Sequence, residues 1–234
     1  MDASAYAFVH GLRNTRATLS AWNRRPWPVL ARWVAGSVIA ASALLVAVWV
    51  IALIAGGSGG VSLHSPPFQA GQPRDVLKIL THNSLVLALH AMACVAGFIA
   101  GSSLPLQAPH RTGLARGLHE HGGRLAIAFV IGATTFSLSA QALILGVSLA
   151  HVASALHTAP GLVLVGLLPH ALPELSALFL PLAAWILASR RGEWDKLLAA
   201  TFVTCLLALP ILVTAAVWEV YVAPHLLGGL IGYW

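Results

Sequence analysis

The sequence predicts an all-α polytopic integral membrane protein with about five transmembrane helices. Hydrophobic residues make up 58% of the chain and charged residues only 9%, whereas ordinary soluble domains carry about 25% charged residues. A chain of 234 residues has room for about five spans of ~20 residues and little else. Any chemistry must therefore be built from the spans and their short connections.

The basic residues predict the orientation of the chain. Eleven of the thirteen Lys and Arg residues lie in three clusters between apolar runs: Arg13, Arg16, Arg24, Arg25 and Arg32; Arg111, Arg116 and Arg124; and Arg190, Arg191 and Lys196. The positive-inside rule places all three clusters in the cytoplasm, with a cytoplasmic N-terminus and an external C-terminus. This placement explains the net charge of +6 and argues against nucleic acid as a partner.

Residues 1–32 are predicted to form a cytoplasmic amphipathic segment. Apolar residues such as Leu19 and Trp22 alternate there with arginines, which is typical of a helix lying on the membrane surface. Pro26 and Pro28 then turn the chain into the bilayer. The alternative interpretation is a basic, partly ordered tail.

Residues 33–234 are predicted to form a single transmembrane helical domain. The spans are expected at about 33–55, 76–104, 125–150, 170–189 and 197–222. An external loop at 56–75 and a cytoplasmic loop at 105–124 join the first three spans. Cys94 and Cys205 lie within apolar runs and are expected to be buried thiols.

A broken or re-entrant segment is expected before the fourth span. One helix over residues 160–189 would be about 45 Å long, well above the ~30 Å of the hydrocarbon core. Pro169, Pro173 and Pro181 lie within it, and prolines kink or break helices. We therefore expect a short segment near 155–168 and a separate span starting near His170.

The candidate functional residues are ionisable side chains within the apolar runs. Glu174 and Glu219 are the two acidic residues so placed, and ionisable groups at membrane depth are functional candidates by default. His170 lies four residues before Glu174, and His225 lies six residues after Glu219. His82 and its neighbour Asn83 are expected at a similar depth, in the outer half of the membrane. His90, two turns deeper, is interpreted as a packing or interhelical bonding residue.

This cluster is compatible with two kinds of chemistry. His170 and Glu174 share a helix face, and with His82, Glu219 and His225 they form a candidate Zn²⁺ ligand set. A glutamate that does not bind the metal, Glu174 or Glu219, would then act as the catalytic general base. The alternative is a buried His–Glu hydrogen-bond network that fixes helix packing or carries protons.

Three segments resemble the stage II sporulation protein M family of bacterial and archaeal membrane proteins. The segment 168–177 reads LPHALPELSA, close to the family's Pro-His-Gly and Glu hallmark, with Ala171 in place of the usual glycine. His82-Asn83 followed by Gly97 and Gly101 is similar to its Asn-containing span. The segment 215–219, AAVWE, is similar to its closing segment. The resemblance covers residues 76–225 and matches Asn83, His170, Glu174 and Glu219 to the family's motif positions.

The resemblance implies a protein of the bacterial or archaeal cytoplasmic membrane. The namesake works as a membrane partner of two peptidoglycan hydrolases, and some relatives belong to circular-bacteriocin gene sets. Three functions stay open: a scaffold or subunit of an envelope-remodelling or peptide-export complex, an intramembrane zinc-dependent peptidase or peptide-maturation enzyme, and a proton-coupled small permease. The expected partners are membrane lipids, other membrane or envelope proteins, a peptide substrate, and further copies of this chain.

Overall fold

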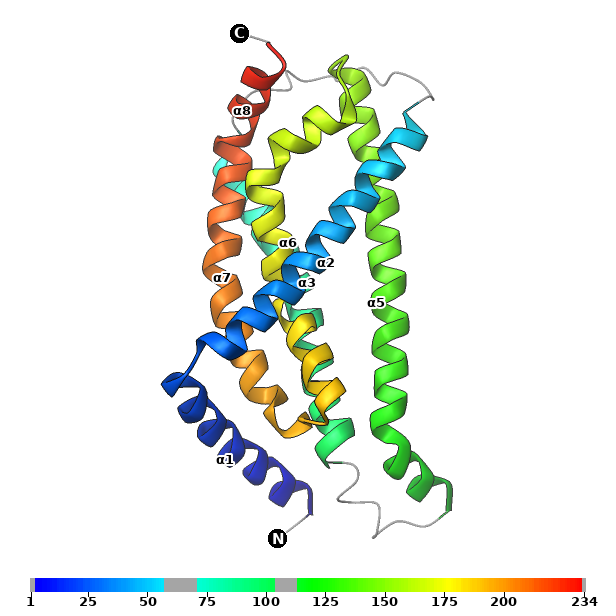
Figure 1. The fold of residues 1–234 in the computed structure, drawn as a ribbon, viewed down its shortest axis with the longest axis vertical. Helices are drawn as coiled ribbons and strands as arrows, with labels where there is room; N and C mark the ends of the chain where they lie inside the picture. Colours follow the sequence, from blue (N-terminus) through cyan, green and yellow to red (C-terminus); the bar gives the residue numbers. More distant parts are fainter. Residues whose placement is uncertain (1–2, 57–70, 104–112, 233–234) are drawn as a thin grey trace. The chain divides into compact units, whose positions relative to one another are not determined.

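The computed structural model describes residues 3–56, 71–103 and 113–232, with side chains described within 13–56, 71–101 and 127–232. All regular structure in these ranges is helical (Figure 1). Five of the described helical segments are long and apolar enough to cross a membrane: Trp27–Ala55, Pro73–Gly101, Ile127–Ala155, Pro160–Arg191 and Trp194–Tyr221. The predicted all-α polytopic class is therefore confirmed.

The described elements occur along the chain in a simple order. They are α1 (Ala3–Arg24), α2 (Trp27–Ala55), α3 (Pro73–Phe98), the π-helical segment η1 (Ile99–Ser103), α5 (Gly113–Ala155), α6 (Pro160–Arg191), the short 3₁₀ segment η3 (Trp194–Lys196), α7 (Leu197–Tyr221) and α8 (Ala223–Leu230). The chain forms two compact units. The first unit contains Met1–Ser37, Val86–Thr134 and Leu178–Ala208, and the second contains Val38–Leu85, Thr135–Ala177 and Leu209–Trp234.

The first unit packs α3 against α6 through polar contacts to backbone carbonyls. His90 Nδ1 lies 2.8 Å from the carbonyl oxygen of Leu178, and its ring packs 5.7 Å from that of Phe179. Cys94, which is fully buried, donates its thiol to the carbonyl oxygen of Pro181 at 3.2 Å. His90 is thus an interhelical bonding residue, as expected from the sequence. Both cysteines are free thiols, Cys94 buried and Cys205 less so.

The second unit packs its helices closely at glycines. A Cβ at Gly146 of α5 would lie 2.6 Å from Cβ of Ile51 on α2, and a Cβ at Gly166 of α6 would lie 2.9 Å from Leu227 of α8. Real Cβ atoms do not approach so closely, so α2 and α5 meet at Gly146 at a distance that requires glycine, whereas the atom near Gly166 is the movable end of the Leu227 side chain. Small residues at helix contacts are typical of membrane proteins.

The predicted division into a short segment near 155–168 and a separate span starting near His170 is wrong. Residues 160–191 form the single helix α6, although its sequence includes Pro169, Pro173 and Pro181. Figure 1 shows the first turns of α6 running obliquely to those that follow. A proline removes one helix hydrogen bond, and neighbouring helices can support the resulting kink without a break. The prolines therefore bend this helix and do not divide it.

Other boundaries also differ from the predictions. Helix α5 begins at Gly113, so residues 113–124 have helical backbone where a loop was expected. Helix α8 was not predicted. Pro224 occupies its first turn, where the missing N–H has no helical partner. The predicted N-terminal helix is confirmed as α1, whereas its place on the membrane surface stays a prediction. The predicted external loop at 56–75 lies largely outside the described residues.

Candidate functional site

A hydrogen bond between two helices marks the candidate site, which lies in the second unit. Asn83 of α3 is 4% exposed, and its Nδ2 donates to Oε1 of Glu174 on α6 at 2.6 Å. Its neighbours His82 and Ser84 are exposed, so Asn83 is the residue of this trio that faces the protein. Polar side chains in apolar helices commonly bond across to another helix. This pair therefore fixes how α3 and α6 face each other here.

The start of α3 is held in place by backbone and capping bonds. The carboxylate of Asp75 accepts the backbone N–H of Gln72 at 2.8 Å, and the N–H of Asp75 donates to the carbonyl oxygen of Gln72 at 2.8 Å. Reciprocal bonds of this kind satisfy donors that the first helical turn leaves free. The N–H of Gly71 also donates to the carbonyl oxygen of Val220 at 3.1 Å. The first turn of α3 is thereby tied to the end of α7.

An open polar cavity of about 510 Å³ lies beside the Asn83–Glu174 bond. Its lining residues are Asp75, Lys78, Ile79, His82, Asn83, Glu174 and Glu219. Three of them carry carboxyl groups and one carries an ammonium group, and no ion pair joins these groups within the described part of the chain. An excess of carboxylates at a cleft attracts cations. This cavity, called the polar cavity below, therefore favours a positively charged ligand.

A second cavity in the same unit, of about 340 Å³, is largely apolar. Its lining residues come from α2, α5, α6, α7 and α8 and are Leu45, Val48, Leu145, Ser148, Leu149, Val152, Val163, Leu164, Leu167, His170, Ala171, Glu174, Leu175, Glu219 and Leu227. Glu174 and Glu219 line both this apolar cavity and the polar cavity. The two carboxyl groups thus border both a charged cavity and an apolar one, an arrangement suited to an amphipathic cation.

His170 contributes a buried and unsatisfied nitrogen to this region. The residue is 5% exposed, and its Nδ1 has no hydrogen-bond partner among the described residues. It lines the apolar cavity and also a further cavity of about 300 Å³ beside Pro210 and Trp218. An unpaired buried polar group costs roughly 1–3 kcal/mol. Such a group is commonly explained by a ligand, a water or a functional role.

The structure brings together most of the residues that the sequence singled out. Asn83, Glu174, Glu219 and His82 line the polar cavity, and His170 lines the apolar cavity. His225 is exposed on α8 and lines neither cavity. Asn83, His82, Glu174, Glu219 and His170 therefore lie around two cavities of one unit, whereas their depth in the membrane and their roles stay predictions.

The predicted zinc site stays a prediction, because the described side chains show no ligand geometry for it. Within the described residues, no three His, Cys, Asp or Glu side chains lie close enough together to hold a metal ion. A catalytic zinc ion needs three protein ligands and one open position. The candidate set His82, His170, Glu174, Glu219 and His225 remains a prediction from the sequence, without a ligand geometry that supports it. The His119-Glu120-His121 side chains lie outside the described residues.

Two charged residues of the site were missed in the sequence. Asp75 lies outside the apolar runs and Lys78 flanks the predicted external loop, yet both line the polar cavity. The signal was their spacing to His82, because positions 75, 78 and 82 are three and four residues apart and share one helix face. The apolar cavity had no comparable sequence signal, because its lining residues come from five helices.

The fold and the paired cavities define a class: a multi-pass α-helical membrane protein with a carboxylate-lined site in its second unit. Comparison of the chain with protein-family models, with curated proteins and with solved structures finds no match. The argument for function therefore rests on the residues of the site.

Proposed function

We propose that this protein is a distant member of the stage II sporulation protein M family and a subunit of an envelope-remodelling or peptide-export complex. In this proposal, the paired cavities receive a segment of a partner or of an exported peptide that is both basic and apolar. The observation that carries the proposal is the position of Glu174 and Glu219, which line the polar and apolar cavities together.

The charge of the site supports a cationic ligand. Asp75, Glu174 and Glu219 line the polar cavity with one ammonium group, that of Lys78. A basic group placed there would gain charge-assisted hydrogen bonds. The apolar side chains next to that basic group would enter the apolar cavity, where burial contributes about 25 cal/mol per Å² of apolar surface.

The resemblance to the family supports the same residues. Asn83, His170, Glu174 and Glu219 are the positions that match the family's motifs, and all four line one or both cavities. Sequence motifs that are scattered over 137 positions (83 to 219) thus describe one site. This agreement supports a common binding role.

A binding experiment tests the proposal with the full chain in detergent. The probe is a labelled short peptide with one lysine flanked by leucines, and the control peptide carries glutamate in place of lysine. We expect fluorescence polarisation to show binding of the lysine peptide only. Glu174→Gln and Glu219→Gln should each weaken that binding about tenfold, which is the worth of one charge-assisted bond.

A matched variant separates this effect from a general loss of charge. Glu193→Gln removes a carboxyl group that lines neither cavity, so it should leave peptide binding unchanged. Equal binding of the two peptides, or equal losses in all three variants, would contradict the proposal.

A proton-coupled permease is the second candidate, and the same pair of carboxylates supports it. Glu174 and Glu219 line both the polar cavity and the apolar cavity. Carboxylates inside membrane proteins commonly mark proton or ion pathways. Proteoliposomes that contain the protein should then dissipate an imposed proton gradient when the lysine peptide is added, and Glu219→Gln should abolish this. If the peptide binds but the proton gradient persists, the permease function is ruled out and the binding proposal stands.

A further inference from the structure

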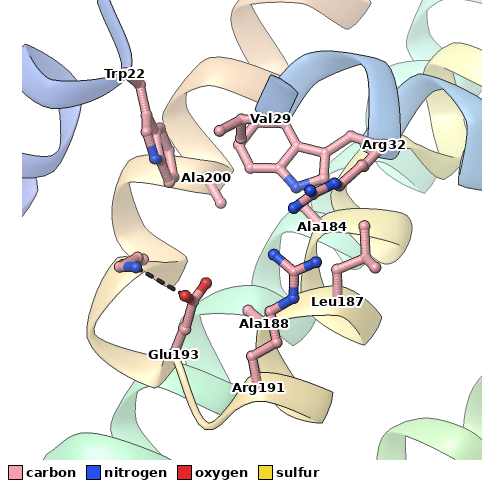
Figure 2. A pocket seen from close by; sticks show the side chains of 11 residues that line it. Trp22, Val29, Arg32, Ala184, Leu187, Ala188, Arg191, Glu193 and Ala200 are labelled. Carbon is pink, nitrogen blue, oxygen red and sulfur yellow. Dashed lines mark hydrogen bonds and ion pairs between the residues drawn. The ribbon is translucent and has the colours of Figure 1, made fainter. Parts of the chain in front are cut away.

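A small pocket in the first unit gathers three basic side chains beside two tryptophans (Figure 2). It has a volume of about 130 Å³ and lies where α1, α2, α6, η3 and α7 meet. Its lining residues are Trp22, Val29, Arg32, Trp33, Ala184, Leu187, Ala188, Arg191, Glu193, Lys196 and Ala200. None of them lines the paired cavities of the second unit, so this basic pocket is a separate feature.

Two arginines of the basic pocket have no anionic partner. Figure 2 shows the guanidinium group of Arg191, at the end of α6, pointing toward that of Arg32 on α2. Neither group forms an ion pair or a hydrogen bond with any described residue. Two guanidinium groups repel each other unless an anion lies between them. Both arginines are exposed, so an anion from outside the chain can reach the two groups together.

The one carboxylate of the basic pocket is already engaged. Oε1 of Glu193 forms an ion pair with Nζ of Lys196 at 2.9 Å, and both side chains are 37% exposed. The pocket as a whole thus carries three cations and one carboxylate. Arginine pairs bind phosphate groups well because each guanidinium can donate two parallel hydrogen bonds.

The walls of the basic pocket are held by packing. Trp22 of α1 meets Trp33 of α2 edge to face, with ring centroids 5.1 Å apart, and Trp33 is 6% exposed. Helix α1 also packs against η3. The two arginines are therefore presented by helices that are fixed relative to one another within this unit.

An apolar groove continues from the basic pocket. This groove has a volume of about 530 Å³ and is lined by Leu19, Ser20, Trp22, Asn23, Pro26, Val29, Leu30, Phe202 and Val203. It shares Trp22 and Val29 with the basic pocket. A phosphate site that opens into an apolar groove matches the two parts of a phospholipid, the headgroup and the acyl chains.

We propose that the basic pocket binds the phosphate group of an anionic phospholipid, with Arg32 and Arg191 as its ligands and the apolar groove holding the start of an acyl chain. The pocket is too small for a whole lipid but admits a phosphate group. Basic pockets between membrane helices on the side with excess Lys and Arg are suited to such headgroups. A free phosphate compound offers the same chemistry without the acyl chain, so the test separates the two sources.

The test uses the full chain in detergent and native mass spectrometry. The probes are short-chain phosphatidylglycerol, short-chain phosphatidylcholine and inorganic phosphate. We expect phosphatidylglycerol to bind more tightly than either of the other probes. Arg32→Gln and Arg191→Gln should each weaken its binding about tenfold, because each removes a charge-assisted pair of hydrogen bonds.

Matched variants make the outcomes decisive. Arg190→Gln removes an exposed arginine that does not line the basic pocket and should leave binding unchanged. Val203→Asn, in the apolar groove, should weaken phosphatidylglycerol but not phosphate. If a variant unfolds, Arg32→Lys, which keeps the charge and loses the paired hydrogen bonds, serves in its place and should show a smaller loss.

Three results would overturn the proposal. Phosphate that binds as tightly as phosphatidylglycerol would show a free anion as the ligand. Equal binding of phosphatidylcholine and phosphatidylglycerol would show that net charge is not recognised. Equal losses in Arg190→Gln and Arg191→Gln would show that general surface charge, and not this pocket, attracts the lipid.

Discussion

Asn83 donates a 2.6 Å hydrogen bond to Glu174 across 91 residues of sequence and between two helices. The bond places a carboxylate at the shared wall of a polar and an apolar cavity. It therefore links the packing of α3 and α6 in the second unit to the chemistry of the candidate site.

Asn83→Ala should destabilise the protein by about 1 kcal/mol, the usual worth of a hydrogen bond between membrane helices. In a Glu174→Ala background the same change should cost less, because its partner is already gone. Denaturant unfolding in mixed micelles measures both values. Thr81→Ala, at an exposed site of the same helix whose hydroxyl bonds only to Leu77, is the control. Strictly additive losses would mean that the bond contributes nothing.

Gly146→Ala and Gly132→Ala should have opposite effects on the free energy of unfolding. Both glycines lie in α5, but a Cβ at Gly146 would meet Ile51 at 2.6 Å, whereas a Cβ at Gly132 would have open space around it. Overpacking costs about 1–3 kcal/mol, and alanine in an open helical position stabilises by up to about 1 kcal/mol. Unfolding midpoints of the two variants test this. If both variants shifted the same way, α2 and α5 would not pack as described.

His170→Leu should leave stability unchanged or increase it, and should weaken binding of the lysine peptide. The reason is that the buried Nδ1 has no hydrogen-bond partner among the described residues, so its removal relieves a cost of roughly 1–3 kcal/mol. Thermal unfolding and fluorescence polarisation on one preparation give both quantities. A strong loss of stability would instead assign His170 to the structural His–Glu network.

Cys205 should react with a small maleimide before Cys94 does in folded protein. Cys94 is fully buried and bonded to the carbonyl oxygen of Pro181, whereas Cys205 is less buried. Mass spectrometry of Cys94→Ala and Cys205→Ala after timed labelling isolates each thiol. Both thiols should react once the protein is unfolded, and equal rates in the folded state would contradict the packing of the first unit.

The sequence alone was enough to predict the class of the fold. Span number, the amphipathic N-terminal helix and most span ends follow from hydropathy and from Pro and Gly positions, which are local properties. The depth argument also selected Asn83, His170, Glu174 and Glu219, because an ionisable or amide group in an apolar run is identifiable without knowing its neighbours.

Only the tertiary structure decided which of these side chains meet. The rotation of α3 about its axis puts Asn83, and not the exposed His82, against Glu174. The apolar cavity depends on five helices, and the facing pair Arg32 and Arg191 depends on contacts between residues far apart in the chain (Figure 2). The missing N–H of proline, a local property, also predicts a break in the helix, yet α6 continues through three prolines. The outcome depends on support from neighbouring helices, and that support is a property of the packed chain and not of the segment itself.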